Sequence, residues 1–182
     1  MRSEIRMLGC LVALFGLSHA GCKGKSIETQ AATTASGQNF SVPVPPDYKL
    51  ITDQRVNSGQ GGVTLVANTR VSKDAFLGSV AVTPVVTQEK VASSDAATCG
   101  QIATLMMQGA PVRIENHGLV DTALGKTCQW TVVDNNVAPR AARGTVMCQD
   151  GLKCWVVTCN YDTRDDKALK ACGQVLAGWK YN

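Results

Sequence analysis

Eight cysteines are the residues of this 182-residue chain with the clearest capacity for chemistry. Cysteine thiols pair as disulfides, bind soft metal ions or act as nucleophiles. The chain has no C-x-x-C motif and only two histidines, and its cysteine spacings do not match the paired ligands of a zinc site. In an oxidising compartment the pattern favours disulfides over structural zinc, which is the alternative. The six cysteines of the second half are Cys99, Cys128, Cys148, Cys154, Cys159 and Cys172.

The first residues of the chain have the composition of an export signal. Arg2 and Arg6 precede an almost wholly apolar run at residues 7–17, and small residues follow that run. The run is too short for a membrane-spanning helix, which needs roughly 20 apolar residues. We therefore expect the protein to be exported to a compartment in which cysteines oxidise.

The end of this signal, Ala20-Gly21-Cys22, resembles the lipobox of bacterial lipoproteins, with His19 where that family prefers leucine. The resemblance implies that the Cys22 thiol receives a diacylglyceryl group and that the signal, residues 1–21, is removed. The alternative is ordinary cleavage after Ala20, which would leave seven cysteines, an odd number. Lipidation takes Cys22 out of the count and leaves six. Parity therefore favours a lipid anchor.

Residues 22–39 predict a flexible tether that begins at the lipidated cysteine. They are rich in Ser, Thr, Ala, Gly and Gln, and Ile27 is their only large apolar side chain, so they lack the apolar surface needed to fold alone. Lys23 is not the aspartate that retains well-studied lipoproteins at the inner membrane, so the resemblance favours the outer membrane. Residues 40–182 have the size of one domain.

The apolar periodicity of this domain predicts an antiparallel sheet. Prolines at 43, 45 and 46 favour an edge strand at its start. Asp150-Gly151 is a turn signal between the last two strands. The expected strands are residues 40–45, 62–69, 76–87, 112–122, 127–134, 141–148 and 153–160.

Two helices are expected around these strands. Ser93, Ser94 and Asp95 offer caps for a middle helix that Gly109 can end. Asp165 is expected to cap a C-terminal helix. The apolar stripe of that helix is Leu169, Cys172, Val175, Leu176 and Trp179.

This order of elements predicts a single α+β domain in which an antiparallel β-sheet is packed by two helices and stapled by disulfides. The Pro-Pro step after the first strand, the middle helix, the meander and a C-terminal helix ending in Gly-Trp-Lys-Tyr resemble the PsbP-like α/β sandwich. The resemblance implies an accessory or binding role at a membrane rather than an enzyme.

The expected elements also narrow the pairings that six cysteines allow. Two cysteines flank a hairpin loop. Cys159 ends a strand, and Cys172 lies on the inward face of the helix that follows it. Cys99 lies near the start of the middle helix, and Cys128 lies near the start of a strand. We predict the pairs Cys99–Cys128, Cys148–Cys154 and Cys159–Cys172, each stabilising the fold by about 2–4 kcal/mol.

Catalytic candidates are few. His117 is the one histidine of the domain, and in a regular strand it would share a face with Arg113 and Glu115. Such a face could bind an anion or a metal, or supply an acid and a base. A solvated strand face is the simpler interpretation. The acidic residues within 161–166 are better explained by a helix start than by a cation site.

The charge pattern limits the possible partners. The formal net charge is +4, the charges are scattered, and aromatic residues are few, which argues against nucleic-acid binding. We predict no cofactor, no metal and no catalytic residues. We expect a non-catalytic lipoprotein that binds a protein or another component of the cell envelope. The alternatives are a small envelope enzyme, or a regulator of one, using Glu115 and His117, and an exported inhibitor presenting a loop at residues 135–140.

Overall fold

A computed structural model describes residues 28–52, 61–68, 78–87, 89–110, 112–134, 140–164 and 166–182. The signal peptide and Cys22 lie outside these described residues. Antiparallel strands dominate the described chain, and two helices, α1 (Ala96–Met106) and α2 (Lys167–Ala177), accompany them. The strands are β1 (Thr29–Gln30), β2 (Thr34–Gly37), β3 (Phe40–Pro43), β4 (Tyr48–Ile51), β5 (Val63–Ala67), β6 (Ser79–Val86), β7 (Val112–Thr122), β8 (Gly125–Asp134), β9 (Arg140–Gln149), β10 (Lys153–Asp162) and β11 (Lys180–Tyr181).

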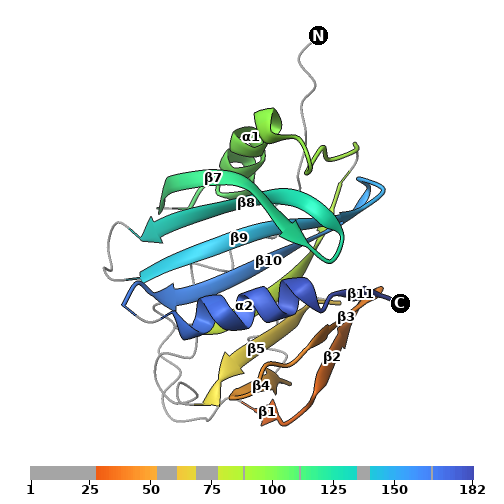
Figure 1. Ribbon diagram of the computed structural model, residues 1–182, viewed down its shortest axis with the longest axis vertical. Helices are drawn as coiled ribbons and strands as arrows, with labels where there is room; N and C mark the ends of the chain where they lie inside the picture. The colour runs from red at the N-terminus through yellow and green to blue at the C-terminus, as the bar shows by residue number, and fades with distance from the viewer. Residues whose placement is uncertain are drawn as a thin grey trace.

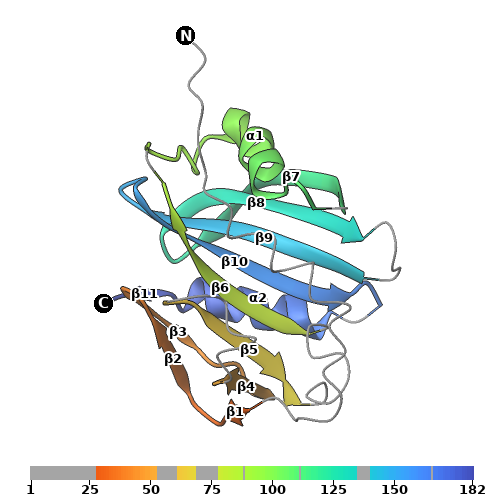
Figure 2. The ribbon, with the colours of Figure 1, turned by 180° about the vertical axis from the view of Figure 1, so that it is seen from behind.

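The described strands form two sheets. The larger has the order β1-β4-β5-β6-β10-β9-β8-β7, and the smaller has the order β11-β3-β2. Figure 1 shows α1 and β7 at one end of the long axis and β1 and β4 at the other, and Figure 2 shows the same separation from behind. The molecule therefore has two ends that lie far apart.

The two faces of the large sheet bury separate cores, because successive side chains of a strand point to opposite sides. Trp155 and Val157 of β10 pack with Val175 of α2. Val156 of β10 and Trp130 of β8 belong to the core that contains the buried side chains of α1. Burial on both sides explains why β10 reads as a nearly continuous apolar run.

The helix cap and the hairpin turn that the sequence predicts are both present. The Asp95 carboxylate accepts a hydrogen bond of 2.9 Å from the Ala97 amide at the start of α1. Asp150 and Gly151 both have positive φ, 53° and 72°, as a tight hairpin turn requires. The predicted cap Asp165 lies outside the described residues, and Asp166 is the residue that precedes α2. Neither described helix is long and apolar enough to cross a membrane.

The prediction of a flexible tether is wrong from residue 28 onward, and residues 22–27 lie outside the described residues. β1 pairs with β4, where Thr29 lies opposite Ile51, and β2 pairs with β3. The side chain of Ala35 in β2 is 1% exposed. Composition missed these strands because they are held by backbone hydrogen bonds and one small buried side chain rather than by large apolar groups.

The class of the fold is also more β-rich than expected. An antiparallel sheet packed by two helices is present, but β1, β2, β4 and β11 add strands that were not predicted. The predicted edge strand β3 lies in the centre of the small sheet. Its prolines are tolerated there because Pro43 ends the strand and β11 pairs only with Phe40 and Ser41.

An aromatic cluster joins the small sheet to the large one. Phe40 of β3 stacks on Trp179 with ring centroids 4.7 Å apart, and Trp155 of β10 lies 5.6 Å from Trp179. Tyr181 of β11 completes the cluster, 5.5 Å from Trp155. The residues after α2 are thereby held to β10 by aromatic packing and to β3 by strand pairing.

Gly144 provides a test of the packing under α1. It lies opposite Trp130, and a Cβ added to it would overlap the indole ring, which is 2% exposed. Gly144→Ala is expected to lower the free energy of unfolding by about 1–3 kcal/mol. Urea denaturation measures this. The control is Gly173→Ala on the exposed side of α2, where an added Cβ meets nothing and the change is expected to stabilise by about 0.5–1 kcal/mol. Equal effects of the two substitutions would contradict the close contact between Gly144 and Trp130.

Tyr181 provides a test at alkaline pH. Its hydroxyl is buried and has no hydrogen-bond partner in the described chain. Burial first, and the negative charge of Asp150 second, raise the pKa of Tyr181 to about 12. Because an unfolded tyrosine ionises near pH 10, the neutral side chain stabilises the fold below about pH 10, and this contribution is lost as the pH rises to about 12. Tyr181→Phe is expected to lose stability less steeply over that window in urea titrations. If the free energy of unfolding fell equally steeply with pH in the two proteins, the proposed role of Tyr181 would be ruled out.

Candidate functional site

A β-bulge decides where the predicted catalytic pair lies. In β7, Ile114 is opposite Val132 and Asn116 is opposite Thr131, so Glu115 is an extra residue without a partner in the ladder. An extra residue reverses the alternation of the residues after it. The prediction that Arg113, Glu115 and His117 share one face is therefore wrong.

The bulge divides the three side chains. Arg113 and Glu115 form an exposed ion pair of 3.3 Å. His117 lies opposite Trp130, whose ring is in the core under α1, so the imidazole is on the α1 side of the sheet. A Cβ added to Gly100 of α1 would lie 2.9 Å from its Nε2 atom. His117 is exposed, and it rests against the helix rather than against Glu115's ion pair.

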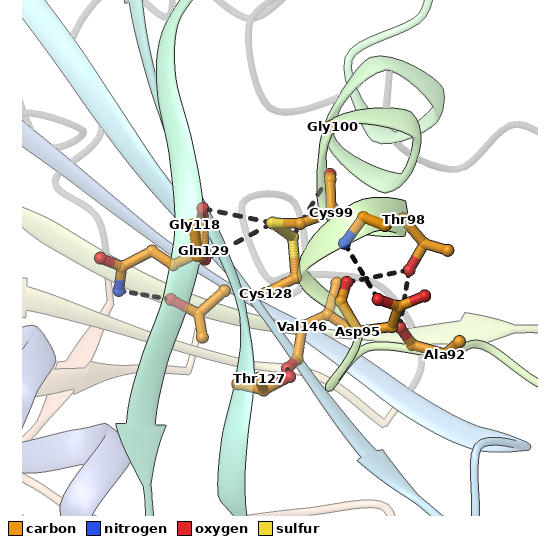
Figure 3. Close-up of a disulfide and its surroundings, with 12 residues drawn as sticks. Ala92, Asp95, Thr98, Cys99, Gly100, Gly118, Thr127, Cys128, Gln129 and Val146 are labelled. Carbon is orange, nitrogen blue, oxygen red and sulfur yellow. Dashed lines mark hydrogen bonds between the residues drawn. A yellow bond between two sulfur atoms is a disulfide. The ribbon is translucent and has the colours of Figure 1, made fainter.

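The Cys99–Cys128 disulfide lies directly beneath this helix and strand. Figure 3 shows it joining the first turn of α1 to β8, with the carbonyl groups of Gly118 and Gln129 beside the sulfur of Cys99. That sulfur is 3.4 Å from the Gly118 oxygen and 3.7 Å from the Gln129 oxygen. Both cysteines are fully buried, so this bond clamps α1 onto the sheet and is closed to solvent.

The other two predicted pairs are also confirmed. Cys148 and Cys154 lie opposite each other in the β9–β10 hairpin, with Cα atoms 4.1 Å apart. Cys159 of β10 is bonded to Cys172 of α2, and their Cα atoms are 6.0 Å apart. All six cysteines of the second half are thus engaged in disulfides.

A groove that the sequence did not reveal lies between α2 and the turn that leads into β4, with a volume of about 690 Å³. One wall is α2, with Lys167, Lys170 and Gln174, and the other is the turn that leads into β4, with Asp47 and Tyr48. The ends of three strands of the large sheet close it, and no lining residue comes from β7. Sequence reasoning missed this groove because no single segment contains enough of its lining to show a pattern.

The charges around this groove are arranged in local pairs. Arg164 donates hydrogen bonds of 2.9 and 2.6 Å to the Asp162 carboxylate, and Lys170 contacts Asp166 at 2.9 Å. The hydrogen bond and the charge of Lys170 lower the pKa of Asp166. Among the described residues, no group of three or more His, Cys, Asp or Glu side chains is placed to hold a metal ion. The groove therefore offers ammonium and carboxylate groups side by side.

Other candidates have structural roles or lie outside the described residues. Met106 and the three tryptophans are buried in the cores. The loop proposed for an inhibitor lies outside the described chain, except for the backbone of Arg140. A comparison with known protein families finds no match to the chain, and no curated protein matches it. Its function must therefore be inferred from its own residues.

The three disulfides are expected to differ in their effect on stability, because they close loops of 29, 13 and 6 residues. In the chain-entropy model, replacing each pair by alanines lowers the free energy of unfolding by about 3.6, 2.9 and 2.2 kcal/mol respectively. Urea denaturation of the three double variants measures this order. A loss for Cys148→Ala with Cys154→Ala as large as that for the Cys99 and Cys128 variant would contradict it.

Proposed function

We propose that this protein is an exported lipoprotein, anchored to the cell envelope through Cys22, whose disulfide-clamped domain acts as a non-catalytic binding module. The observation that carries the proposal is the pairing of all six downstream cysteines. Cys10 belongs to the signal, so Cys22 is the one cysteine of the mature chain left over. An unmodified thiol left over in an oxidising compartment is a liability, and acylation removes it.

The construction of the domain supports a binding role. Two helices are clamped to one sheet, α1 through Cys99 and α2 through Cys172, so the relative positions of the surface elements are held covalently. A preorganised surface of this kind loses little conformational entropy when a partner binds. The proposed partner is a protein or another envelope component, and nucleic acid is not among the candidates.

The enzyme alternative receives less support from the same geometry. It requires Glu115 and His117 to work as a pair, whereas the bulge leaves Glu115 with Arg113 and directs His117 toward Gly100. Neither residue lines the groove beside α2. The proposal of a binding module therefore does not depend on these two side chains.

The anchor is tested by the intact mass of the protein purified from an exporting bacterium. We expect a chain that begins at Cys22, carries the mass of its acyl groups and has lost six hydrogen atoms to its three disulfides. Cys22→Ala is expected to abolish both the acyl mass and the partitioning into a detergent phase, because each buried methylene contributes about 0.8 kcal/mol to membrane binding. Ser26→Ala is the matched control and is expected to keep both. An unacylated product that begins at Gly21 would refute the proposal.

A further inference from the structure

The point at which the fold begins limits how far the domain can move from its anchor. The Thr52 amide donates a hydrogen bond of 3.0 Å to the Glu28 carbonyl, and Thr29 lies opposite Ile51, so the chain is part of the large sheet from residue 28. Six residue steps lead from Cys22 to Glu28, and they span at most about 22 Å. A fold that began at Phe40 would have allowed about 65 Å.

The strand that is held near the anchor is at one edge of the sheet. β1 and β7 are the two edge strands, separated by seven strand spacings, which amounts to about 34 Å. Figures 1 and 2 both place β1 at the end of the long axis opposite α1 and β7. A tether shorter than the sheet is wide, attached at one edge, holds that edge toward its point of attachment.

One wall of the groove beside α2 is close to β1. Its lining residue Tyr48 begins β4, the neighbour of β1, and strand geometry places it about 14 Å from Glu28. Its walls carry the ammonium groups of Lys167 and Lys170 and the carboxylates of Asp47 and Asp162. These lining charges are equal in number, and Asp162 and Lys170 are already paired with Arg164 and Asp166. A surface with no net positive charge favours zwitterionic phospholipid head groups over anionic ones.

We infer that the end formed by β1, β4 and this groove is the membrane-facing surface of the domain, and that it contacts zwitterionic phospholipid head groups. The end formed by α1 and β7 then faces away from the bilayer and is free for the partner. This inference rests on the proposed anchor at Cys22.

The test places a fluorophore at either end of the full-length acylated protein. Gln174→Cys on α2 lines the groove, and Gln101→Cys on α1 is its matched control, since both are exposed glutamines of helices. A thiol-reactive dye marks each introduced cysteine while the disulfides stay intact. The proteins are reconstituted into phosphatidylcholine vesicles that contain a small fraction of head-group spin-labelled lipid.

We expect the spin label to quench the dye at position 174 at least twofold more than the dye at position 101. Iodide without vesicles should quench the two dyes equally, which shows that they are equally exposed to solvent. Equal spin-label quenching at both sites, or stronger quenching at position 101, in protein of confirmed acyl mass overturns the orientation and leaves the anchor standing. Protein without acyl mass that fails to float with the vesicles overturns the anchor and this inference together.

Discussion

The register of β10 is the constraint on which most of this structure depends. β10 pairs with β6 on one side and β9 on the other, and both of its faces are buried. Cys154 and Cys159 are an odd number of positions apart, so they point to opposite faces. One closes the β9–β10 hairpin through Cys148, and the other reaches α2 through Cys172. A slip of one residue would turn each cysteine away from its partner and exchange the two cores.

A second local event, the bulge at Glu115, determines the character of the β7 edge. It leaves an ion pair on one side of the strand and turns His117 toward α1. Exposed charges and a bulge on an edge strand also hinder pairing with another chain, because they interrupt the ladder that a second strand would extend. The bulge that separates Glu115 from His117 therefore also protects β7, a long edge strand, from pairing with another chain.

The two ends of the domain differ in how they are built. At the α1 end, a buried disulfide fixes one helix over two strands. Toward the other end, α2, the start of β4 and the end of β5 border the groove. If such a domain is attached at one end, the disulfides that join its helices to the sheet keep its other end in a fixed position relative to the attached end. This geometry is what connects the proposed anchor to the proposed binding role.

The central elements and the cysteine pairs could be predicted from the sequence. The helix cap, the hairpin turn and the apolar stripe of α2 each depend on residues that are close in the chain: Asp95, Asp150-Gly151 and the stripe from Leu169 to Trp179. Such local patterns can be read from the sequence. The order of the elements then indicates which cysteines lie close together. The start of the fold, the bulge and the groove depend instead on contacts between segments that are distant in the chain. β1 and β2 are stabilised by hydrogen bonds to strands that follow them in the chain, and no local hydrophobic pattern records such bonds. The bulge likewise depends on the register between β7 and β8, and the groove on elements more than a hundred residues apart that become neighbours only when the chain has folded.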